Sequence, residues 1–501
     1  MATTSPLDPL LPRPVWAAFD AIRRIPRPSR REDKIVAEVR RWAAGHGFPV
    51  TADAAGNLLV KVPASPGREG APVVVLQAHL DMVTEKNRGV EHDFDRDPIE
   101  VYLDGDWVKA RGTTLGADNG IGAALGMAAA TDPDFDHPPL ELLFTLDEET
   151  GLNGALQLDP ALVGGRLMLN LDSEDEGIVY IGCAGAIAVE ASFELERAAA
   201  APSAPPAGES YELMVSGLRG GHSGTEIHTH RGNANKILAR LLAAAVERGA
   251  DPGLVSVDGG DKPNAIPRES FAQLLLSAGD RQILEAALAE ILPLQREELA
   301  GYDPGLEIGL RPLPPGERKA WPATTAAQRD RLLRAIDAAP AGVLAMSPEM
   351  PGLVETSANT SVVRTEEGKT VVLVSVRSSR NPTLDAAAQS LESLFRLAGG
   401  QTRRTRGYPG WLPNPAAPLL ARILRVYEEQ TGAKMSVQAV HAGLECGVLA
   451  RKLDGLDAVS FGPDIRGAHS PDERVSVPSV ARTYELLKAL LGDLAARPAN
   501  G

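Results

Sequence analysis

Apolar residues recur every three or four positions through residues 14–48, for example at Val15, Phe19 and Ile22. This is the spacing of one face of an α-helix, and it predicts that the segment is helical. Three later apolar runs, each followed by polar residues, predict buried strands at residues 71–82, 140–146 and 166–172. An Ala-rich helix that opens on a Gly-rich turn is predicted between the first two, at residues 113–130. Strands that alternate with helices indicate an α/β fold with a mostly parallel sheet flanked by helices.

A different pattern begins near residue 186. Residues 188–196 and 210–218 alternate between apolar and polar side chains, as strands with one buried face do. The Pro/Ala-rich stretch between them, residues 197–209, predicts a flexible hairpin connection. A helix is predicted next, at residues 233–249. This mixture of strands and helices predicts a domain of the α+β class.

The change of pattern also predicts how the chain is divided. A chain of 501 residues is longer than one core of ordinary size needs, so more than one domain is expected. We predict a first domain made of two segments, residues 1–185 and 411–501. The α+β domain, residues 186–410, is inserted between them.

The composition is that of a soluble globular protein, with 44% hydrophobic and 23% charged residues. The net charge of −15 argues against nucleic acid as a partner. The two cysteines, Cys183 and Cys446, are too few for a disulfide framework, which fits a reducing compartment. The N-terminal segment lacks the pattern of a signal peptide, and no apolar stretch is long enough to span a membrane. We therefore expect a cytoplasmic protein that does not bind membranes.

Histidines and carboxylates gather where the predicted strands end. His79 and Asp81 would share one face of a strand, so Asp81 can hold the ring of a metal-bound His79. Asp118 lies in a Gly-rich turn, where small neighbours let a cation approach. The other candidates follow predicted strands or lie in a loop near the C-terminus: Glu148, Glu149, Asp172 and His469. Each of these alone is more often a cap or turn residue, but all are expected at one edge of the sheet, and together they suit borderline divalent metals.

The number of candidates indicates two metal ions rather than one. Five ligands are too many for a single tetrahedral zinc and suit two ions that share a carboxylate. Such a pair can polarise a carbonyl and activate water, but a base that is not a ligand must take the proton. Adjacent strand residues point to opposite faces, so one residue of the Glu148–Glu149 doublet can bind metal while its neighbour handles protons.

Longer motifs extend this pattern over nearly the whole chain. They are VVLQAHLDMV, TTLGADNGIG, EETGLNGA, NLDSEDEG, GCAGA, GLRGGHSGTEIH, PNAIPRE, HAGLECG and GAHSPDE. With these motifs in this order, the chain resembles the M20 metallopeptidases and, within them, the bacterial cytosolic aminoacyl-histidine dipeptidase (peptidase D) group. The resemblance implies a zinc-peptidase-like fold. It also implies that the inserted domain is a lid that carries dimer contacts, so we expect a homodimer.

The resemblance implies a set of metal ligands as well. Two zinc ions per subunit would be bound, and Co²⁺ or Mn²⁺ could substitute for them. The implied ligands are Asp118 as the bridge, His79 and Asp172 at one site, and Glu149 and His469 at the other.

Further roles are implied for residues around these ligands. Asp81 would orient the ligand histidine, and Glu148 would be the general base. His222 of the GGHSG motif would stabilise the carbonyl oxygen as it becomes negative, in its own subunit or across a dimer interface. Glu445 would meet the free amino group of a dipeptide, and Asn264 would be a further substrate contact.

These features predict a metal-dependent dipeptidase that hydrolyses dipeptides with a free N-terminus. Its specificity would be broad, with Xaa-His peptides such as β-alanyl-histidine among the candidate substrates. The alternatives are an aminoacylase or tripeptidase-like amide hydrolase of the same chemistry, and a catalytically silent dimeric binding protein. The glutamate of HAGLECG favours free amines over acylated ones, and the complete set of ligands and base disfavours a silent relative. The sequence defines neither the preferred side chains nor the metal used in the cell.

Other candidates remain open or are disfavoured. His228 and His230 would share a face on a strand and could bind a separate metal, but no acids complete that set, so a solvated lid segment is favoured. Cys446 is disfavoured as a nucleophile because a thiolate needs a nearby base and a lowered pKa. Either Arg377 or Arg380 could hold a substrate carboxylate, and the sequence does not decide between them.

Overall fold

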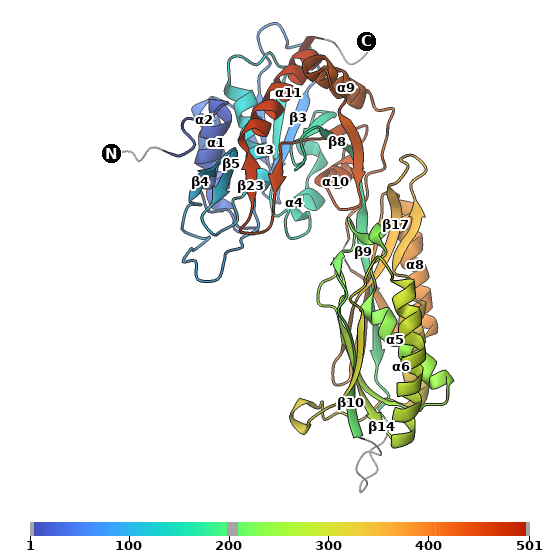
Figure 1. Cartoon of the computed structure of the whole chain (residues 1–501). Helices are drawn as coiled ribbons and strands as arrows, with labels where there is room; N and C mark the ends of the chain where they lie inside the picture. The colour runs from blue at the N-terminus through green and yellow to red at the C-terminus, as the bar shows by residue number, and fades with distance from the viewer. Residues whose placement is uncertain (1–4, 198–208, 406, 497–501) are drawn as a thin grey trace. The chain divides into compact units, whose positions relative to one another are not determined.

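The computed structural model describes residues 5–197, 209–405 and 407–496, which form two compact units (Figure 1). Unit 1 contains the described residues of Met1–Cys183, Trp411–Val440 and Leu444–Gly501. Unit 2 contains the described residues of Ala184–Gly410 and the short segment His441–Gly443.

A sheet of eight strands forms the centre of unit 1. In spatial order the strands are β1 (Val50–Ala52), β2 (Leu58–Val62), β6 (Leu140–Thr145), β3 (Val74–His79), β7 (Leu167–Asn170), β21 (Asp457–Ser460), β8 (Ile178–Cys183) and β20 (Ser436–Val440). The central strands β6, β3, β7 and β21 run parallel, and so do β8 and β20. The pairs β1–β2, β2–β6 and β8–β21 are antiparallel. The predicted α/β fold with a mostly parallel sheet is confirmed.

Helices cover the central strands of unit 1. Every residue of β3 and β6 is buried, as expected for strands covered on both faces. Helix α3 packs against β3 and β6, α9 and α10 pack against β21, and α11 packs against α3 and α9. The helices of this unit are α1 (Arg13–Arg23), α2 (Asp33–Gly45), α3 (Ala117–Thr131), α4 (Asn153–Gln157), the 3-10 helix η1 (Pro160–Leu162), α9 (Pro418–Thr431), α10 (Glu445–Lys452) and α11 (Val477–Ala496).

The segment 14–48, predicted to be helical, forms two helices in the structure. The prediction is wrong for the residues that connect them. Helix α1 ends at Arg23 and α2 begins at Asp33. Pro26 and Pro28 lie between them, and each lacks a backbone N–H and disfavours helical backbone in the residue before it. The connection instead carries Arg27 into the interior, where its side chain is 1% exposed.

The carboxyl ends of the parallel strands meet along one edge of the sheet. Strand β3 ends at His79, β6 at Thr145 and β7 at Asn170. The pairing sets His79 beside Thr145, and Gln77 of β3 beside Asn170. His79 ends β3, and the turns after β6 and β7 carry Glu149 and Asp172, so three candidate ligands lie at the edge where parallel sheets bind their ligands.

A small four-stranded sheet in unit 1 was not predicted. Its strands, in spatial order, are β22 (Ile465–Arg466), β23 (Arg474–Ser476), β5 (Trp107–Ala110) and β4 (Val101–Asp104). Strands β22 and β23 pair in antiparallel orientation, and the loop between them carries His469.

Unit 2 is built on an antiparallel sheet of nine strands. In spatial order they are β15 (Glu307–Pro312), β10 (Glu209–Ser216), β14 (Ser270–Leu276), β12 (Gly253–Gly259), β17 (Val354–Thr365), β18 (Lys369–Ser378), β9 (Gly185–Glu194) and β19 (Gln401–Arg404), with β16 (Gly342–Met346) paired to β17. Its helices are α5 (Ala234–Glu247), α6 (Ala278–Glu298), α7 (Ala326–Ala338), α8 (Asn381–Leu397) and the 3-10 helices η2 (Ile227–Thr229) and η3 (Pro315–Glu317). A separate pair of short strands joins β11 (Gly221–His222) to β13 (Ala265–Ile266).

The predicted elements of the inserted segment fall on elements of unit 2. The predicted strands 188–196 and 210–218 correspond to β9 and β10, and the predicted helix 233–249 corresponds to α5. The predicted hairpin connection 197–209 lies outside the described residues except at its two ends. No helix formed by residues 5–197, 209–405 and 407–496 has the length and apolar character of a membrane span.

Candidate metal centre

The structure brings the five ligand candidates of unit 1 together at the carboxyl edge of its sheet. Their ligand atoms form two groups, each with all its ligand atoms within 4.8 Å of one another: His79, Asp118 and Asp172, and Asp118, Glu149 and His469. Oδ1 of Asp118 lies 3.1 Å from Nε2 of His79, and Oδ2 lies 3.1 Å from Nε2 of His469. The two oxygens of one carboxylate therefore face two histidines, as a carboxylate shared by two ions would.

A second carboxylate completes each group. Asp172 Oδ1 lies 3.4 Å from Nε2 of His79, and Glu149 Oε2 lies 2.9 Å from Nε2 of His469. The side-chain amide of Asn119 donates to Asp172. Oε1 of Glu149 is buried and has no hydrogen-bond partner among the described residues. A buried carboxylate oxygen is costly unless a donor or a cation reaches it, so this oxygen suits a metal ligand.

Asp81 anchors the turn that carries the two adjacent glutamates. Its Oδ1 accepts the backbone N–H of Glu148 at 3.0 Å, and its Oδ2 accepts that of Glu149 at 3.1 Å and the hydroxyl of Ser29 at 2.7 Å. Oδ1 also lies 3.5 Å from Nδ1 of His79. Burial opposes ionisation, but the bonds from His79, the glutamate amide and the serine lower the pKa of Asp81 to about 2. Asp81 is therefore an ionised anchor for both the histidine and the doublet.

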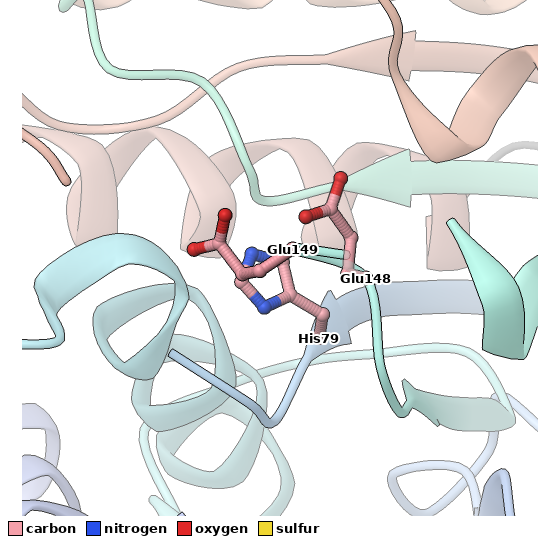
Figure 2. Close-up of side chains that lie close together, drawn as sticks. All are labelled: His79, Glu148 and Glu149. Atoms are coloured by element: carbon pink, nitrogen blue, oxygen red, sulfur yellow. The ribbon is translucent and has the colours of Figure 1, made fainter. Parts of the chain in front are cut away.

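Glu148 and Glu149 lie in the turn after β6, not in the strand. Figure 2 shows their carboxylates on either side of the His79 ring in this view, and the three side chains form a further group of possible ligand atoms. The explanation of their divergence by strand alternation is wrong, because neither residue belongs to β6. The turn sets their directions instead, through Asp147 with its φ of +50° and through the bonds to Asp81.

Acids outnumber histidines in this cluster, and their pKa values reflect the crowding. Burial raises the pKa of Glu148 well above its ordinary value and that of Asp172 to about 6. Burial would lower the pKa of His79, but Asp172 and Asp118 raise it well above its ordinary value. Hydrogen bonds to Asp118 and to a glutamate raise the pKa of His469 to about 11. A divalent cation offsets such an excess of buried negative charge, so this donor set fits two ions.

His222 lies in unit 2, and its surroundings leave Nε2 as a hydrogen-bond donor. Its Nδ1 accepts backbone N–H groups from Gly224 at 3.3 Å and Thr225 at 3.1 Å. Burial and the charge of Arg377 lower its pKa to about 4, so the ring is neutral at pH 7. A neutral ring whose Nδ1 accepts carries its proton on Nε2, which is then free to donate.

Asn264 lies close to His222 within unit 2. It directly precedes Ala265, which pairs with His222 in the β11–β13 ladder, and its carbonyl accepts the N–H of Ser223 at 2.8 Å. Its side chain is exposed. Asn264 and His222 thus belong to one site in unit 2, whereas the candidate ligands belong to unit 1.

The two arginine candidates of unit 2 differ in their partners. Arg380 donates to Glu355 at 2.7 Å and also pairs with Glu349. Arg377 is 7% exposed and donates to the hydroxyl of Tyr408 at 3.2 Å, and its Nε has no partner in the described part of the chain. The structure therefore leaves Arg377, and not Arg380, open to an anion.

Arg377 also lies beside His222. A Cβ atom on Gly224 would lie 3.0 Å from Cε1 of His222 and 3.2 Å from Nε of Arg377. The ring and the guanidinium thus flank the same glycine. A buried guanidinium without an anionic partner suits the planar geometry of a carboxylate.

Glu445 is buried at the start of α10. Its Oε2 accepts hydrogen bonds from Nε2 of Gln77 and Oγ1 of Thr145, each at 2.6 Å. Oε1 has no partner among the residues that the structure describes. Burial raises the pKa of Glu445 to about 7. The side chain is 0% exposed, so contact with a substrate amine would use Oε1 and would require the groups that cover it to shift.

The structure does not support a metal site at His228 and His230 or a nucleophile at Cys446. His228 lies in η2, and His230 follows it with a φ of +54°, so the pair does not lie on a strand. Neither belongs to a group of possible metal ligands in the described ranges. Burial raises the pKa of the Cys446 thiol well above its ordinary value, which disfavours a thiolate nucleophile.

Two buried residues beside this cluster were missed from sequence. Residues 115–119, which lead into α3 and have non-helical backbone at Asp118 and Asn119, form the turn that carries Asp118. Glu473 accepts backbone N–H groups from this turn, and Arg27 donates to backbone carbonyls of the turn and of the segment after β3. Glu473 lies in the GAHSPDE motif, four residues after His469, which is the one signal that pointed to it. Arg27 carries no signal of its own, because its partners are main-chain atoms far away in sequence.

The sequence and the fold have known counterparts. Residues 75–493 match the family described as "Peptidase family M20/M25/M40". The chain is 41% identical over 494 residues to the cytosol non-specific dipeptidase of Escherichia coli (strain K12), and this alignment covers 98% of the chain and 100% of that relative.

Solved structures show the same architecture. The crystal structure of an aminoacylhistidine dipeptidase from Vibrio alginolyticus is similar with a TM-score of 0.87 and 40% identity, covering 97% of this chain and 98% of that one. The aminopeptidase PepT from Bacillus cereus ATCC 10987 shares the fold, with a TM-score of 0.55 and 15% identity over 97% of this chain and 99% of that one.

Proposed function

The chain belongs to the peptidase family M20/M25/M40 and is a peptide hydrolase, and we propose that it is a dipeptidase that uses two zinc ions per subunit. Its substrates would be dipeptides with a free N-terminus, over a broad range of side chains. The observation that carries the proposal is the sharing of Asp118 between two groups of possible ligands. Two relatives that match nearly the whole chain at 40% identity or more are named dipeptidases, which supports this substrate class.

The ligand roles follow from the two groups. Asp118 would bridge the ions, with His79 and Asp172 at one site and Glu149 and His469 at the other. When bound, the ions would polarise the scissile carbonyl and lower the pKa of the attacking water. Oε1 of Glu149, which has no hydrogen-bond partner within the described part of the chain, and the excess of acids over histidines support this assignment.

Glu148 would move the proton. It belongs to neither of the two groups that share Asp118, although it lies beside His79. Burial raises its pKa well above the ordinary value, which suits a group that must both accept and return a proton near neutral pH. It would take the proton from the attacking water and give it to the leaving amine, while Asp81 holds His79 and the glutamate turn in place.

His222 would stabilise the carbonyl oxygen as negative charge develops on it. Its Nδ1 is occupied by backbone N–H groups and its ring is neutral, so Nε2 is the donor. A donor placed where charge appears lowers the barrier to attack.

Recognition of both ends of the substrate would define a dipeptide. Arg377 would hold the C-terminal carboxylate, because its guanidinium is buried and its Nε has no partner among residues 5–197, 209–405 and 407–496. Glu445, through Oε1, would meet the free amino group, and Asn264 would be a further contact. A longer peptide or an N-acylated amino acid would not satisfy both ends at once.

Two expectations about the cell accompany this function. We propose a homodimer whose contacts lie in the inserted domain, residues 186–410, which would act as a lid over the catalytic domain. We also propose a cytoplasmic location, in line with the name of the Escherichia coli relative.

A substrate panel combined with metal removal tests the proposal. Dipeptides, including β-alanyl-histidine, should be cleaved with kcat/KM about 10- to 100-fold above tripeptides and N-acetylated amino acids, since each unsatisfied end group costs about 1.5–3 kcal/mol. Chelation should abolish cleavage, and zinc, cobalt or manganese should restore it. Activity that survives chelation, or a preference for acylated substrates, would contradict the proposal.

A further inference from the structure

Two charged residues lie buried next to the candidate metal centre without being ligands. Glu473 and Arg27 are each 1% exposed. Glu473 precedes β23, and Arg27 lies in the connection between α1 and α2. Removing a charge from water is unfavourable, so each residue needs partners that offset the loss of hydration. Both find partners in the main chain of the turn that carries Asp118.

Glu473 connects this turn to the loop of His469. Its Oε2 accepts the N–H groups of Leu115 at 2.7 Å and Gly116 at 2.9 Å, and its Oε1 accepts the N–H of Asp118 at 3.1 Å. Its own N–H donates to Ser470 at 3.0 Å, which closes the short loop after His469. One carboxylate therefore fixes the backbone of Asp118 relative to the loop that supplies His469.

Arg27 connects the same turn to the segment after His79. Its Nη1 donates to the carbonyls of Leu80 at 2.8 Å and Asp81 at 2.9 Å, and its Nη2 donates to the carbonyl of Gly116. A Cβ atom on Gly120 would lie 2.7 Å from Nη2, so α3 begins in close contact with the guanidinium. Arg27 thus fixes the Asp118 turn relative to the chain that supplies His79.

The two residues bond to the two peptide groups that flank the Cα atom of Gly116. Glu473 accepts from the N–H of Gly116, and Arg27 donates to the carbonyl of Gly116. Gly116 has a φ of +69°, and a side chain there would meet Met82 and the guanidinium. The turn therefore has little freedom to shift without breaking a charged hydrogen bond, and such bonds are the stronger kind.

We propose that Glu473 and Arg27 are positioning residues of the metal centre, each acting on a different ion. Glu473 sets the distance between Asp118 and His469 and so tunes the Asp118–Glu149–His469 site. Arg27 sets the distance between Asp118 and His79 and so tunes the His79–Asp118–Asp172 site. This inference rests on the proposed two-metal function, and its test separates the two.

Zinc titration by isothermal calorimetry measures each site alone. Asp172→Asn should leave one ion, at the site of His469, and His469→Ala should leave one ion, at the site of His79. In the Asp172→Asn background, Glu473→Gln should weaken zinc binding about 10- to 100-fold, as loss of a residue that orients ligands does, and Arg27→Lys should change it less than about 3-fold. In the His469→Ala background the order should reverse. In Glu473→Gln the side-chain NH₂ faces one of the backbone N–H groups whose hydrogen bond the carboxylate of Glu473 accepts. Two donors then face each other, and the turn is displaced.

The zinc affinities of the variants distinguish positioning of one ion from general support of the fold. Equal weakening of both sites by both substitutions would reduce the residues to general supports of the fold and overturn the inference. No weakening by either would also overturn it. Glu473→Asp, which keeps the charge but shortens the reach, provides a second variant if Glu473→Gln does not fold, and it should show the same site preference. If the unmodified protein does not bind two zinc ions, the proposed function fails instead, whatever the variants do.

Discussion

Asp81 accepts the backbone N–H groups of both Glu148 and Glu149, so the two residues share one anchor. Their carboxylates have different surroundings. Glu149 lies 2.9 Å from His469, whereas burial raises the pKa of Glu148 and no histidine pairs with it at that distance among the described residues. Different surroundings allow different roles for the same side chain, one as ligand and the other as base.

Conservative substitution of each glutamate should separate these roles. Glu148→Gln should keep two zinc ions per subunit and lower kcat by a factor of about 10² to 10⁴, the usual contribution of general acid–base catalysis. Glu149→Gln should lose one ion, because an amide oxygen is a weaker ligand than a carboxylate. Zinc content by mass spectrometry and steady-state kinetics give both readouts. Equal loss of metal in the two variants would contradict the division of roles.

The Arg377 guanidinium, whose Nε has no partner among the described residues, predicts a specific loss of substrate binding on substitution. Arg377→Met keeps much of the volume and removes the charge, so KM for dipeptides should rise about 10- to 100-fold, the worth of a charged hydrogen bond. Dipeptide amides, which lack the carboxylate, should lose much less. Arg380→Met is the matched control, because Arg380 is already paired with Glu349 and Glu355. A similar rise in KM for both variants would rule out the assignment.

At the scale of elements, the start of helix α3 depends on close approach. A Cβ atom on Gly122 would overlap the carbonyl oxygen of Leu171 and the side-chain oxygen of Asn119, whose amide donates to Asp172. Gly126 lies one turn later in the same helix, and a Cβ atom there would have its nearest neighbours at 4.0 Å. Two glycines of one helix thus have different constraints.

Alanine substitution should therefore have opposite effects at these positions. Gly122→Ala should lower the free energy of unfolding by about 1–3 kcal/mol through overpacking, and it should disturb the Asp172 ligand through Asn119. Gly126→Ala should raise it by about 0.5–1 kcal/mol, because alanine is the better helix former. Urea unfolding of the two variants measures the difference. Destabilisation of equal size at both positions would show that close contact at Gly122 does not cause the loss of stability.

Elements with strong local patterns were predicted, and those that depend on distant partners were not. The strands β3, β6 and β7 are mostly apolar, and the polar residues at and after their ends pointed to the cluster of candidate ligands. The four-stranded sheet pairs residues 101–110 with residues 465–476, and its short strands have no apolar run long enough to detect. The break between α1 and α2 was present in the sequence as two prolines but was hidden by helical spacing on either side.

The same limit applies to the site residues. His79, Asp118 and His469 were identifiable because metal binding requires particular side chains, and these lie at a strand end, at the start of a helix and in a loop. Arg27 and Glu473 were not, because they act on backbone N–H and carbonyl groups, which every residue possesses. Side-chain identity alone cannot reveal a contact of that kind.

At the scale of the whole molecule, unit 2 buries a neutral histidine, His441, beside Arg377. Burial and the charge of Arg377 lower the pKa of His441 to about 3, and its Nε2 lies 2.7 Å from the hydroxyl of Ser357. The pKa of a histidine in an unfolded chain is about 6.5. Below about pH 6.5 the unfolded state therefore binds a proton at His441 that the folded state does not bind. The contribution of His441 to the free energy of unfolding is complete above about pH 6.5 and is lost as the pH falls towards 3.

His441→Gln tests this pH dependence. The free energy of unfolding of the chelator-treated protein should fall below pH 6.5, with His441 contributing up to about 1.4 kcal/mol per pH unit. The glutamine variant should show a shallower slope, since it has no proton to exclude. Urea unfolding between pH 7.5 and pH 5 measures both slopes. Identical slopes would mean that His441 is not responsible.

The spatial order of the unit 1 sheet also has a consequence for protein synthesis. Strand β21, from near the C-terminus, lies between β7 and β8, which are formed by residues 167–183. A ribosome that adds about 5–20 residues per second makes His469 roughly 20–80 s after His79. Strands β7 and β8 are made early in that interval, and the edges that pair with β21 stay unpaired until after the whole sheet of unit 2, whose last strand ends at Arg404, has been made. Synthesis of unit 1 therefore begins first and ends last, and protease treatment of ribosome-arrested chains should find unit 2 protected before β7 is.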